Sequence, residues 1–314
     1  MTVNAIVINY RTPGLSIEAV ASLQEEMKSL APFRTYLIDN ASGDDSIAVL
    51  KQALERPGWR DSVVLVEAPR NGGFGYAINL AVRRALAAGD APDYFYVLNP
   101  DALVEPGSLA RVIAFLDHHP KAGLAGSHIR GTDGKSQVAA FHFPSLLGEI
   151  ENAVSLGPLT WLLRDHVVSL PSPVSDCEVD WISGTSMLIR RSTFETIGFF
   201  DEEFFLYFEE IDFCRRAKTA GIQSWFVADA PITHIGAVST GMMDQTRAMP
   251  PYWFDSRHRY FRKHHGLGYA AACDVARVLG MLVWRAKERV AGRPGHWRPN
   301  LLRDFLAASW KNLR

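Results

Sequence analysis

Three carboxylates, Glu209, Glu210 and Asp212, lie within four positions, directly after the aromatic-rich run 204–208. On a helix, Glu209 and Asp212 would share one face while Glu210 would point elsewhere. Acidic side chains that crowd together beside apolar ones repel each other and lose solvent, so the pKa of at least one should rise toward the range of a general base. The structural alternative is a solvated helix start, where the acids complement the helix dipole and pair with the arginines that follow.

A second acidic position, Asp101, follows a distant aromatic run. Residues 94–98 are apolar and favour a strand, and the chain then turns at Asn99. The carboxyl end of such a strand is where open α/β sheets bind ligands, and a carboxylate there suits Mg²⁺ or Mn²⁺ on a diphosphate. His234 would supply a second ligand of a type that suits Mn²⁺. An Asx turn at Asp101 and a hydrogen-bonded structural His234 are the alternatives.

The elements that would position these residues follow from hydrophobic patterning. The apolar runs 3–9, 33–38, 62–67 and 94–98 predict buried strands, and the segments between them have helical spacing. Their alternation predicts an α/β fold, with a mostly parallel, doubly wound sheet flanked by helices. Farther along, the pattern predicts helices at 109–118 and 209–220, strands at 122–129, 181–190 and 224–228, and an irregular connection with a short helix over 131–180.

Polar loops follow the first, second and fourth predicted strands, and they should meet at one rim of the sheet. A nucleoside could bind there, with Asp39 accepting a hydrogen bond from a pyrimidine imino group. The loop 71–75 is glycine-rich and opens a helix, so it offers backbone N–H groups and a positive helix end. Because this loop follows the third strand and lacks the dinucleotide fingerprint, an NAD site is disfavoured.

Composition limits the classes of function. The chain has 314 residues, 47% of them hydrophobic, and a net charge of −1, which argues against nucleic-acid binding through a general basic field. Three widely spaced cysteines indicate neither a disulfide framework nor a zinc site and fit a reducing cytoplasm. We expect no signal peptide at the amino terminus. No run reaches the ~18 consecutive apolar residues of a membrane-spanning helix, so we expect no membrane span.

The sequence changes character from Tyr252 onward, where aromatic and basic residues interleave, as in Trp253, Arg257 and Trp284. Side chains of these two kinds suit the headgroup level of an anionic bilayer. Equally, a helix could pack on the sheet with its basic side chains extended toward water. Peripheral contact with the inner face of the cytoplasmic membrane is therefore one of two interpretations of this tail.

Taken together, these motifs resemble the family 2 inverting glycosyltransferases of GT-A fold, in particular their rhamnosyltransferase-like branch. The matching segments occur in the family's order and cover residues 3 to about 265. They are 7–10, 38–42, 71–79, 98–101, 181–184, 199–202, 204–205, 209–212 and His234. The resemblance implies a GT-A domain at 1–250, with a nucleotide-binding half at 1–101 and an acceptor-binding half at 102–250, and a helical, basic-aromatic extension at 251–314.

The resemblance also implies residue roles. The catalytic base would be Glu210, one methylene longer than the aspartate usual there, with Glu209 or Asp212 as alternatives. Asp101 and His234 would bind Mg²⁺ or Mn²⁺, although Asn99 replaces the first acid of the family's Asp-x-Asp element and lowers the charge of the site. The nucleotide sugar would contact Asn9, Tyr10, Arg11, Asp39, Asn40, Asn71, Gly73, Phe74, Asn79, Asn99 and Asp101, and the acceptor would contact Trp181, Ser183 and Gly184.

The implied reaction is transfer of a sugar from a nucleoside diphosphate, with dTDP-L-rhamnose as the first donor to consider. The acceptor would be a hydroxyl of a cell-envelope glycan or lipid-linked saccharide, and a homodimer stays open. Two other functions remain compatible with the sequence: a non-catalytic protein that binds sugar nucleotides, and a sugar nucleotidyltransferase. The second is disfavoured because no glycine-rich basic loop follows the first strand to hold a triphosphate.

Overall fold

The computed structural model describes residues 2–28, 33–89, 91–154, 157–236, 244, 246–290, 292 and 298–312, with the backbone alone at 153–154 and 157–159. Two further residues of the basic-aromatic tail, Arg293 and Trp297, lie outside the described residues. The chain forms two compact units, and each takes up segments that are far apart in the sequence. The first unit comprises Met1–Phe141, Pro171–Phe205 and Glu209–Thr240, and the second comprises His142–Leu170, Leu206–Phe208 and Gly241–Arg314.

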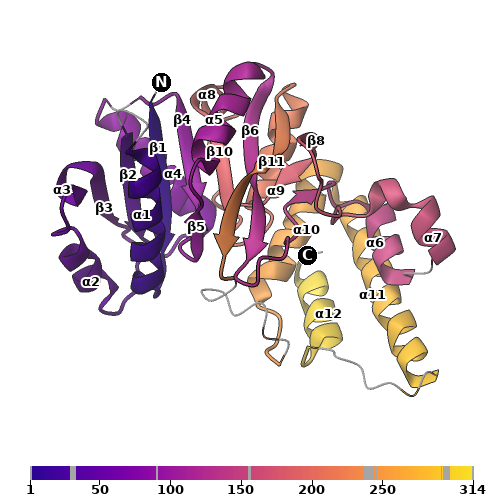
Figure 1. Cartoon of the computed structure of the whole chain (residues 1–314). Helices are drawn as coiled ribbons and strands as arrows, with labels where there is room; N and C mark the ends of the chain where they lie inside the picture. The colour runs from indigo at the N-terminus through magenta and orange to yellow at the C-terminus, as the bar shows by residue number, and fades with distance from the viewer. Residues whose placement is uncertain are drawn as a thin grey trace. The chain divides into compact units, whose positions relative to one another are not determined.

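The first unit is built on one large mixed sheet and a small two-stranded one. The large sheet has the order β3-β2-β1-β4-β10-β6-β11-β5, with β8 also pairing β11 (Figure 1). In the small sheet, β7 pairs β9. The strands are β1 (Val3–Asn9), β2 (Phe33–Asp39), β3 (Val63–Glu67), β4 (Tyr94–Leu98), β5 (Ala102–Val104), β6 (Ala122–Gly131), β7 (Ala140–Phe141), β8 (Cys177–Val179), β9 (Trp181–Ile182), β10 (Ser186–Arg190) and β11 (Gln223–His234).

The first four strands are parallel, as the alternating pattern predicts. Every residue of β1 and β4 is buried, which explains why both read as continuous apolar runs. The strand order reverses after β3, so that β4 returns to pair with β1 on the side opposite β2. Because such crossovers are right-handed, this reversal places the helix before β4 on the other face of the sheet from the helix after β1. The switch point between β1 and β4 is where sheets of this kind bind ligands.

The other half of the sheet is not parallel throughout. β10 runs antiparallel between β4 and β6, while β11 is parallel to β6 and antiparallel to β5. The predicted single strand 181–190 is two strands, β9 and β10, which belong to different sheets and are separated by residues 183–185. That break is a correction to the sequence prediction. Its consequence is that Ser183 and Gly184 occupy a turn, which lies at the carboxyl edge of β4.

Helices flank this sheet and bury their periodic faces on it. α1 packs on β1, β2 and β5, α4 packs on β1 and β2, and α5 packs on β6 and β11. The buried side of α1, with Ala19, Val20 and Leu23, has the spacing that the sequence shows. The helices of the first unit are α1 (Pro13–Met27), α2 (Ser46–Ala53), α3 (Trp59–Ser62), α4 (Phe74–Ala87), α5 (Ser108–His118), α8 (Arg191–Ile197) and α9 (Glu209–Thr219).

The second unit is helical, and it draws in a segment that the sequence assigns to the sheet domain. Residues 142–170, predicted as an irregular connection with one short helix, form helices α6 and α7 and a 3-10 turn, and α6 packs on α11. Phe254, Met281 and Phe305 form the apolar centre where α10, α11 and α12 meet. The elements are α6 (Leu146–Val154), α7 (Gly157–Leu162), η1 (Arg164–His166), α10 (Pro251–His265), α11 (Leu267–Val290) and α12 (Leu301–Asn312).

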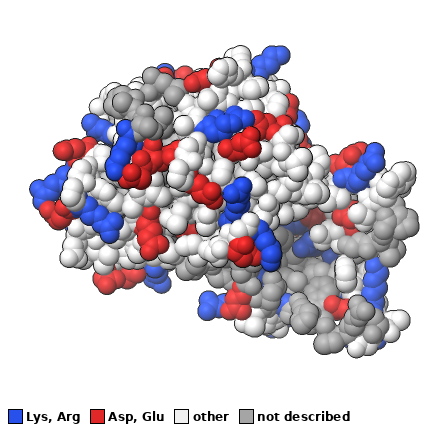
Figure 2. All heavy atoms as spheres, in the orientation of Figure 1, with Lys and Arg blue, Asp and Glu red and all other residues white. Residues whose placement is uncertain are grey.

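By length and composition, α11 is long and apolar enough to cross a membrane, with a mean hydropathy of 1.4 over its best window and 33% of that window buried in the structure. The sequence-based expectation of no such segment rested on uninterrupted apolar runs, and α11 is interrupted by Asp274 and Arg277. On the face shown in Figure 2, acidic and basic side chains are interspersed over the first unit rather than gathered by sign.

Candidate active site

The candidate site lies at the carboxyl edge of the parallel strands. Asn9 and Asp39, the last residues of β1 and β2, are register partners. Ser186, the first residue of β10, pairs with Leu98 at the end of β4, and the Asn99 backbone N–H donates to the Thr185 carbonyl at 2.9 Å. The loops after β1, β2 and β4 and the turn before β10 therefore share one rim.

A buried polar network joins the first two loops. Asp39 Oδ1 accepts hydrogen bonds from Asn9 Nδ2 at 2.7 Å and from Ser42 Oγ at 2.5 Å, and Asp39 Oδ2 accepts one from the Ser42 backbone N–H at 3.0 Å. Asn9 is fully buried, and its Oδ1 accepts from Ser16 Oγ at 2.9 Å. In this structure Asn9 and Asp39 thus hold each other and the 40–42 turn in place. Ser42, absent from the predicted site residues, is central to that arrangement.

Tyr10 and Arg11 form the outer part of the same rim. Arg11 has a left-handed backbone, with φ 58°, which its own bonds to the neighbouring loop hold. Its backbone N–H donates to Ser42 Oγ at 3.0 Å and its Nε donates to the Ser42 carbonyl at 2.9 Å. The guanidinium lies 5.2 Å from the centre of the Tyr10 ring. This exposed cation is anchored at the edge where a phosphate would arrive.

The glycine-rich loop is held by Asn40. Its Nδ2 donates to Asn71 Oδ1 at 3.0 Å and to the Gly73 carbonyl at 3.2 Å, so the loops after β2 and β3 are joined. Gly73 has φ +92°, and a Cβ there would lie 1.8 Å from the Phe205 carbonyl oxygen. The Phe74 N–H, first of α4, donates to that same oxygen at 3.1 Å. Glycine is therefore required for the loop to pass so close to residue 205.

Asn79 lies deeper, on the buried side of α4. Its Oδ1 accepts from the Phe200 N–H at 3.0 Å, and its Nδ2 donates to the Phe200 carbonyl and to Glu202 Oε1, both at 2.9 Å. Its exposed fraction is zero. The side chain fastens the segment before α9 to α4, and a nucleotide contact by Asn79 stays a prediction.

The acidic helix α9 begins beside the glycine-rich loop. A Cβ on Gly75 would meet Glu209 Cβ at 3.6 Å, so the first turns of α4 and α9 lie against each other. Glu209 is buried, and burial together with the charge of Glu210 raises its pKa well above the usual value. Burial raises the pKa of Glu210 to about 7. Among the described residues, neither side chain's Oε2 has a hydrogen-bond partner.

The third acid of the cluster, Asp212, has a different environment. It is fully buried, and its Oδ2 accepts from Arg216 Nε at 2.9 Å. Arg216 also donates to the carbonyls of Ile197 and Phe199, at 2.6 and 2.8 Å. The pair therefore ties α9 to the chain after α8. This ion pair engages the Asp212 carboxylate, whereas Glu210 has a carboxylate oxygen with no hydrogen-bond partner among the described residues.

Asp101 and His234 are brought together by the pairing of β5 with β11, in which Ala102 is the partner of His234. His234 Nε2 lies 3.3 Å from Asp101 Oδ1, and His234 Nδ1 lies 3.1 Å from Gln137 Oε1. An amide oxygen only accepts, so Nδ1 carries a proton. When the ring is neutral, Nε2 turns a lone pair toward the carboxylate, and a divalent ion between the two side chains would be coordinated by both.

Two side chains alone, however, do not complete the coordination of a divalent ion. In the part of the chain that the structure describes, no group of three or more His, Cys, Asp or Glu side chains could hold a metal ion. A divalent ion at Asp101 and His234 would take its other ligands from a diphosphate and water, as Mg²⁺ commonly does. Gln137 orients the imidazole from outside, and nothing in its sequence surroundings signals this role.

The predicted acceptor residues lie in β9 and in the turn between β9 and β10. Trp181 is buried and stacks on Phe141, with ring centres 3.9 Å apart. Ser183 Oγ lies 2.9 Å from Thr185 Oγ1, which fixes the turn between β9 and β10. A Cβ on Gly184 would lie 2.9 Å from the Phe74 ring, so this glycine lets the turn pack on the start of α4. The turn between β9 and β10, the glycine-rich loop and α9 therefore adjoin within the first unit.

Comparisons with known proteins agree with this geometry. A family model, glycosyl transferase family 2, matches residues 5–212, about two thirds of the chain. The chain is 33% identical over 241 residues to an N-acetylglucosaminyl-diphospho-decaprenol L-rhamnosyltransferase of Mycobacterium tuberculosis, covering 73% of this chain and 75% of that protein. It is 31% identical over 163 residues to the rhamnosyltransferase WbbL of Escherichia coli, covering 49% and 58%.

Solved structures show the same fold. A mannosyltransferase from Pyrobaculum calidifontis, solved with GDP-mannose and Mn²⁺, superposes with a TM-score of 0.55 at 16% identity, covering 99% of this chain and 86% of that one. The fold is therefore GT-A, as the resemblance implies, with carboxy-terminal helices added. The chain is a glycosyltransferase and belongs to glycosyl transferase family 2, in its rhamnosyltransferase-like branch.

Proposed function

We propose that this enzyme transfers L-rhamnose from dTDP-L-rhamnose to a hydroxyl of a lipid-linked saccharide, with inversion at the anomeric carbon. Two relatives named as rhamnosyltransferases support the sugar, and the M. tuberculosis relative, whose name includes a sugar diphosphate on decaprenol, supports the acceptor class. A lipid-linked acceptor implies work at the inner face of the cytoplasmic membrane, where activated donors and polyprenyl lipids meet.

One observation carries the mechanism: Glu210, at the start of α9, has a raised pKa of about 7 and a carboxylate oxygen with no partner among the described residues. Such a group is deprotonated often enough near neutral pH and still basic enough to take a proton. Glu210 removes the proton of the acceptor hydroxyl while that oxygen attacks the anomeric carbon. The bond from this carbon to the diphosphate breaks on the opposite side, and the diphosphate leaves with the electron pair.

Glu209 contributes by competing with Glu210 for one proton rather than by taking the proton of the acceptor. It is the more deeply buried of the two acids, and burial together with the charge of Glu210 raises its pKa well above the usual value, which favours its neutral form. Two adjacent carboxylates cannot both ionise cheaply in a poorly solvated place, so one proton shared between them keeps a single base available. Gly75, next to Glu209, keeps this acid pair against the start of α4.

The donor's diphosphate is proposed to lie between Arg11, the N-terminus of α4 and the Asp101–His234 pair. Arg11 offers an anchored guanidinium, and α4 offers N–H groups at its positive end. Asp101 and His234 would hold Mg²⁺ or Mn²⁺, which stabilises the negative charge that develops on a departing diphosphate. Asp39, already bonded to Asn9 and Ser42, would line the nucleoside side of the site.

The test is a donor panel with a synthetic polyprenyl diphosphate N-acetylglucosamine acceptor. We expect release of dTDP from dTDP-L-rhamnose to exceed release of UDP or GDP from UDP-N-acetylglucosamine or GDP-mannose. EDTA should stop the release and Mn²⁺ should restore it. NMR of the product should show an anomeric configuration opposite to that of the donor. Faster turnover of another donor would refute the assignment of rhamnose, and retained configuration would refute the single displacement.

A further inference from the structure

The longest helix of the second unit, α11, leaves one apolar face uncovered. Val275, Leu279, Leu282, Ala286 and Val290 follow one another at intervals of three or four residues, so they lie along one side of the helix. The four larger side chains among them are between 47% and 90% exposed. We name these five residues the α11 stripe. Scattered exposed apolar residues are ordinary, but a continuous stripe over four turns indicates a partner.

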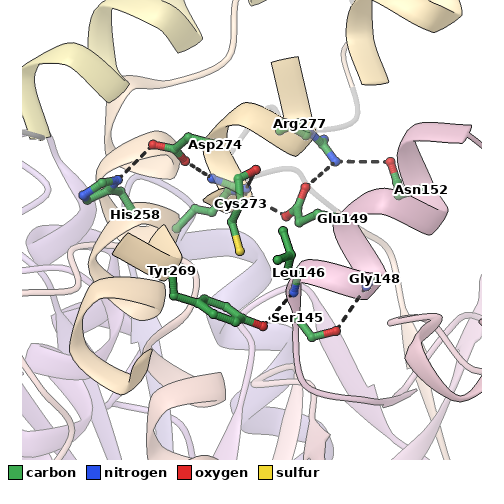
Figure 3. Close-up of polar contacts among 11 residues, drawn as sticks. Ser145, Leu146, Gly148, Glu149, Asn152, His258, Tyr269, Cys273, Asp274 and Arg277 are labelled. Carbon is green, nitrogen blue, oxygen red and sulfur yellow. Dashed lines mark hydrogen bonds and ion pairs between the residues drawn. The ribbon is translucent and has the colours of Figure 1, made fainter. Parts of the chain in front are cut away.

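The opposite side of α11 is fixed by a buried ionic network (Figure 3). Arg257 of α10, 1% exposed, donates to Asp274 Oδ1 at 2.5 Å and to Glu149 Oε1 of α6 at 3.1 Å. His258 Nδ1 lies 3.0 Å from Asp274 Oδ2, and Arg277 donates to Asn152 Oδ1 at 3.2 Å. These bonds set the rotation of α11 about its own axis, so the stripe is held outward.

The same network decides how α11 would meet a membrane. Although α11 has the length and composition of a membrane-spanning helix, a spanning orientation would carry Asp274 and Arg277 into hydrocarbon and break their pairing with α6 and α10. An orientation in the plane of the membrane keeps the network intact and buries only the stripe. A helix with one ionic and one apolar side is of the interfacial kind.

Charge identifies the surface that the stripe would meet. Residues 251–314 hold thirteen Lys and Arg against four Asp and Glu, a surplus of nine positive charges in a chain whose net charge is −1. Arg285 and Arg289 border the stripe on one side and Lys287 borders it on the other, at 100° per residue. A second copy of this chain would bring an equally positive tail to the contact and be repelled, whereas anionic lipid headgroups would be attracted.

We propose that the α11 stripe is a membrane-docking surface that lies flat in the headgroup region of an anionic bilayer. Leu279 and Leu282 insert into the acyl boundary, and Arg285, Lys287 and Arg289 contact anionic headgroups. Docking would bring the enzyme to the lipid-linked acceptor of its proposed function. Binding to vesicles nevertheless needs neither donor nor acceptor, so the docking surface and the sugar transfer can be tested independently of each other.

The test is flotation of the full chain with vesicles of phosphatidylcholine alone or with about 30% phosphatidylglycerol. We expect binding only to the anionic vesicles, weakened by salt. Leu279→Glu/Leu282→Glu should weaken it by about tenfold or more for each leucine removed. Arg285→Gln/Arg289→Gln should weaken it by about fivefold for each charge removed and reduce its salt dependence.

The matched control is Leu86→Glu/Val138→Glu, which places two acids at exposed apolar positions of the first unit, 39% and 45% exposed. It should bind vesicles as the unmodified chain does. Circular dichroism would show that each variant is folded. Equal flotation of the stripe variant and the unmodified chain, or strong binding to neutral vesicles, would overturn the proposal. Light scattering that shows a dimer converted to a monomer by the stripe variant would assign the face to a second copy instead.

Discussion

At the scale of single residues, Glu210 combines two demands that oppose each other. A catalytic base must be partly desolvated for its pKa to approach neutrality, and the same desolvation makes the ionised form costly to keep in the folded protein. The start of α9 partly offsets this cost, because the positive end of a helix favours negative charge in its first turn. Function and stability are therefore coupled at this one side chain, and both sides of the coupling are measurable.

Activity should depend on the ionised form of Glu210. We expect Glu210→Gln to lower kcat by about 10²–10⁴-fold, because the amide cannot take a proton, and to leave donor binding within about twofold. In the unmodified enzyme, the rate should rise with pH to a plateau above about 7, the pKa of this carboxyl. Exposed Glu203 offers the matched control Glu203→Gln, which should retain full activity. A fully active Glu210→Gln would refute the assignment.

The same substitution, Glu210→Gln, should raise the stability of the folded protein although it lowers the activity. Because the folded pKa of Glu210, about 7, is above its usual 4.5, the folded state binds its proton more tightly than the unfolded state does. The resulting penalty grows as the pH rises from about 4.5 to 7 and is constant above. Glu210→Gln should therefore stabilise the protein by at most about 3 kcal/mol at pH 8 and by almost nothing at pH 4. Thermal melts at both values check this, and an equal effect at both would contradict it.

Gln137 gives a prediction for a residue that orients a ligand. Replacing it with leucine removes the acceptor that fixes the His234 tautomer, so half-maximal activity should need about 10–100-fold more Mn²⁺. Gln137→Glu retains an acceptor and should stay near the unmodified value. Calorimetric titration of Mn²⁺ in the presence of dTDP gives an independent readout. If Gln137→Leu responds to Mn²⁺ as the unmodified enzyme does, Gln137 does not orient His234 for metal binding.

At the scale of elements, close approach between backbones determines the site. Gly73 brings the glycine-rich loop within hydrogen-bonding distance of residue 205, four residues before Glu209. Farther along α4, Asn79 makes a second attachment to the segment before α9, because its Oδ1 accepts a hydrogen bond from the Phe200 N–H. The helix that would bind phosphate and the helix that carries the acids are thus joined at their starts, so a change in one should be felt by the other.

Alanine substitutions at two glycines with positive φ distinguish the effect of the close approach to residue 205 from ordinary backbone strain. Gly73→Ala adds a Cβ that would lie 1.8 Å from a carbonyl oxygen, whereas Gly43→Ala, at φ +70°, meets nothing within 4 Å. We expect a loss of about 1–2 kcal/mol for Gly43→Ala and about 3–5 kcal/mol for Gly73→Ala. Only Gly73→Ala should also weaken dTDP binding, as measured by calorimetry. Equal losses of stability in the two variants would mean that the close approach to residue 205 is unimportant.

The sequence predicts the parallel half of the sheet well, because β1 and β4 are short, mostly apolar runs that end in turn residues. It predicts one strand over 181–190, since nothing in this segment shows that its two ends pair in different sheets. The acids of α9 and the aspartates at strand ends are visible as residue types. Ser42, Gln137 and Thr185 are not, because their roles arise from contacts with Arg11, His234 and Asn99, which lie far away in the sequence and which no local pattern encodes.

At the scale of the whole molecule, the two units do not follow a single cut in the sequence. Residues 142–170 join the second unit through the packing of α6 on α11 and the contact of Glu149 with Arg257. Leu206–Phe208 also belongs to it, where Phe208 packs near Tyr260 and Ser256 Oγ donates to the Leu206 carbonyl at 3.1 Å. The chain then enters α9 of the first unit at Glu209. The second unit is thus continuous in sequence with the acid-bearing helix.

The ionic network of the second unit is the feature whose removal should reveal this division. Arg257→Met would leave Glu149 and Asp274 buried without their shared partner, which costs about 3–5 kcal/mol. The loss should be confined to the unit that holds all three residues. Hydrogen exchange would then show faster exchange in α10 and α11, with α4 and β1 unchanged.

A surface pair in the same unit provides the control. Lys311→Met removes an exposed contact with Asp255, so its cost should be at most about 1 kcal/mol.

Acid should act on the network as Arg257→Met does. Burial alone would raise the pKa of Asp274, but the hydrogen bond from His258 and the charge of Arg257 outweigh burial and lower it. The stabilisation from Asp274 is therefore present above about pH 4 and lost as the pH falls through its folded pKa. If Arg257→Met instead accelerates exchange equally in α4 and α11, the two units unfold as one, and the ionic network stabilises the whole enzyme.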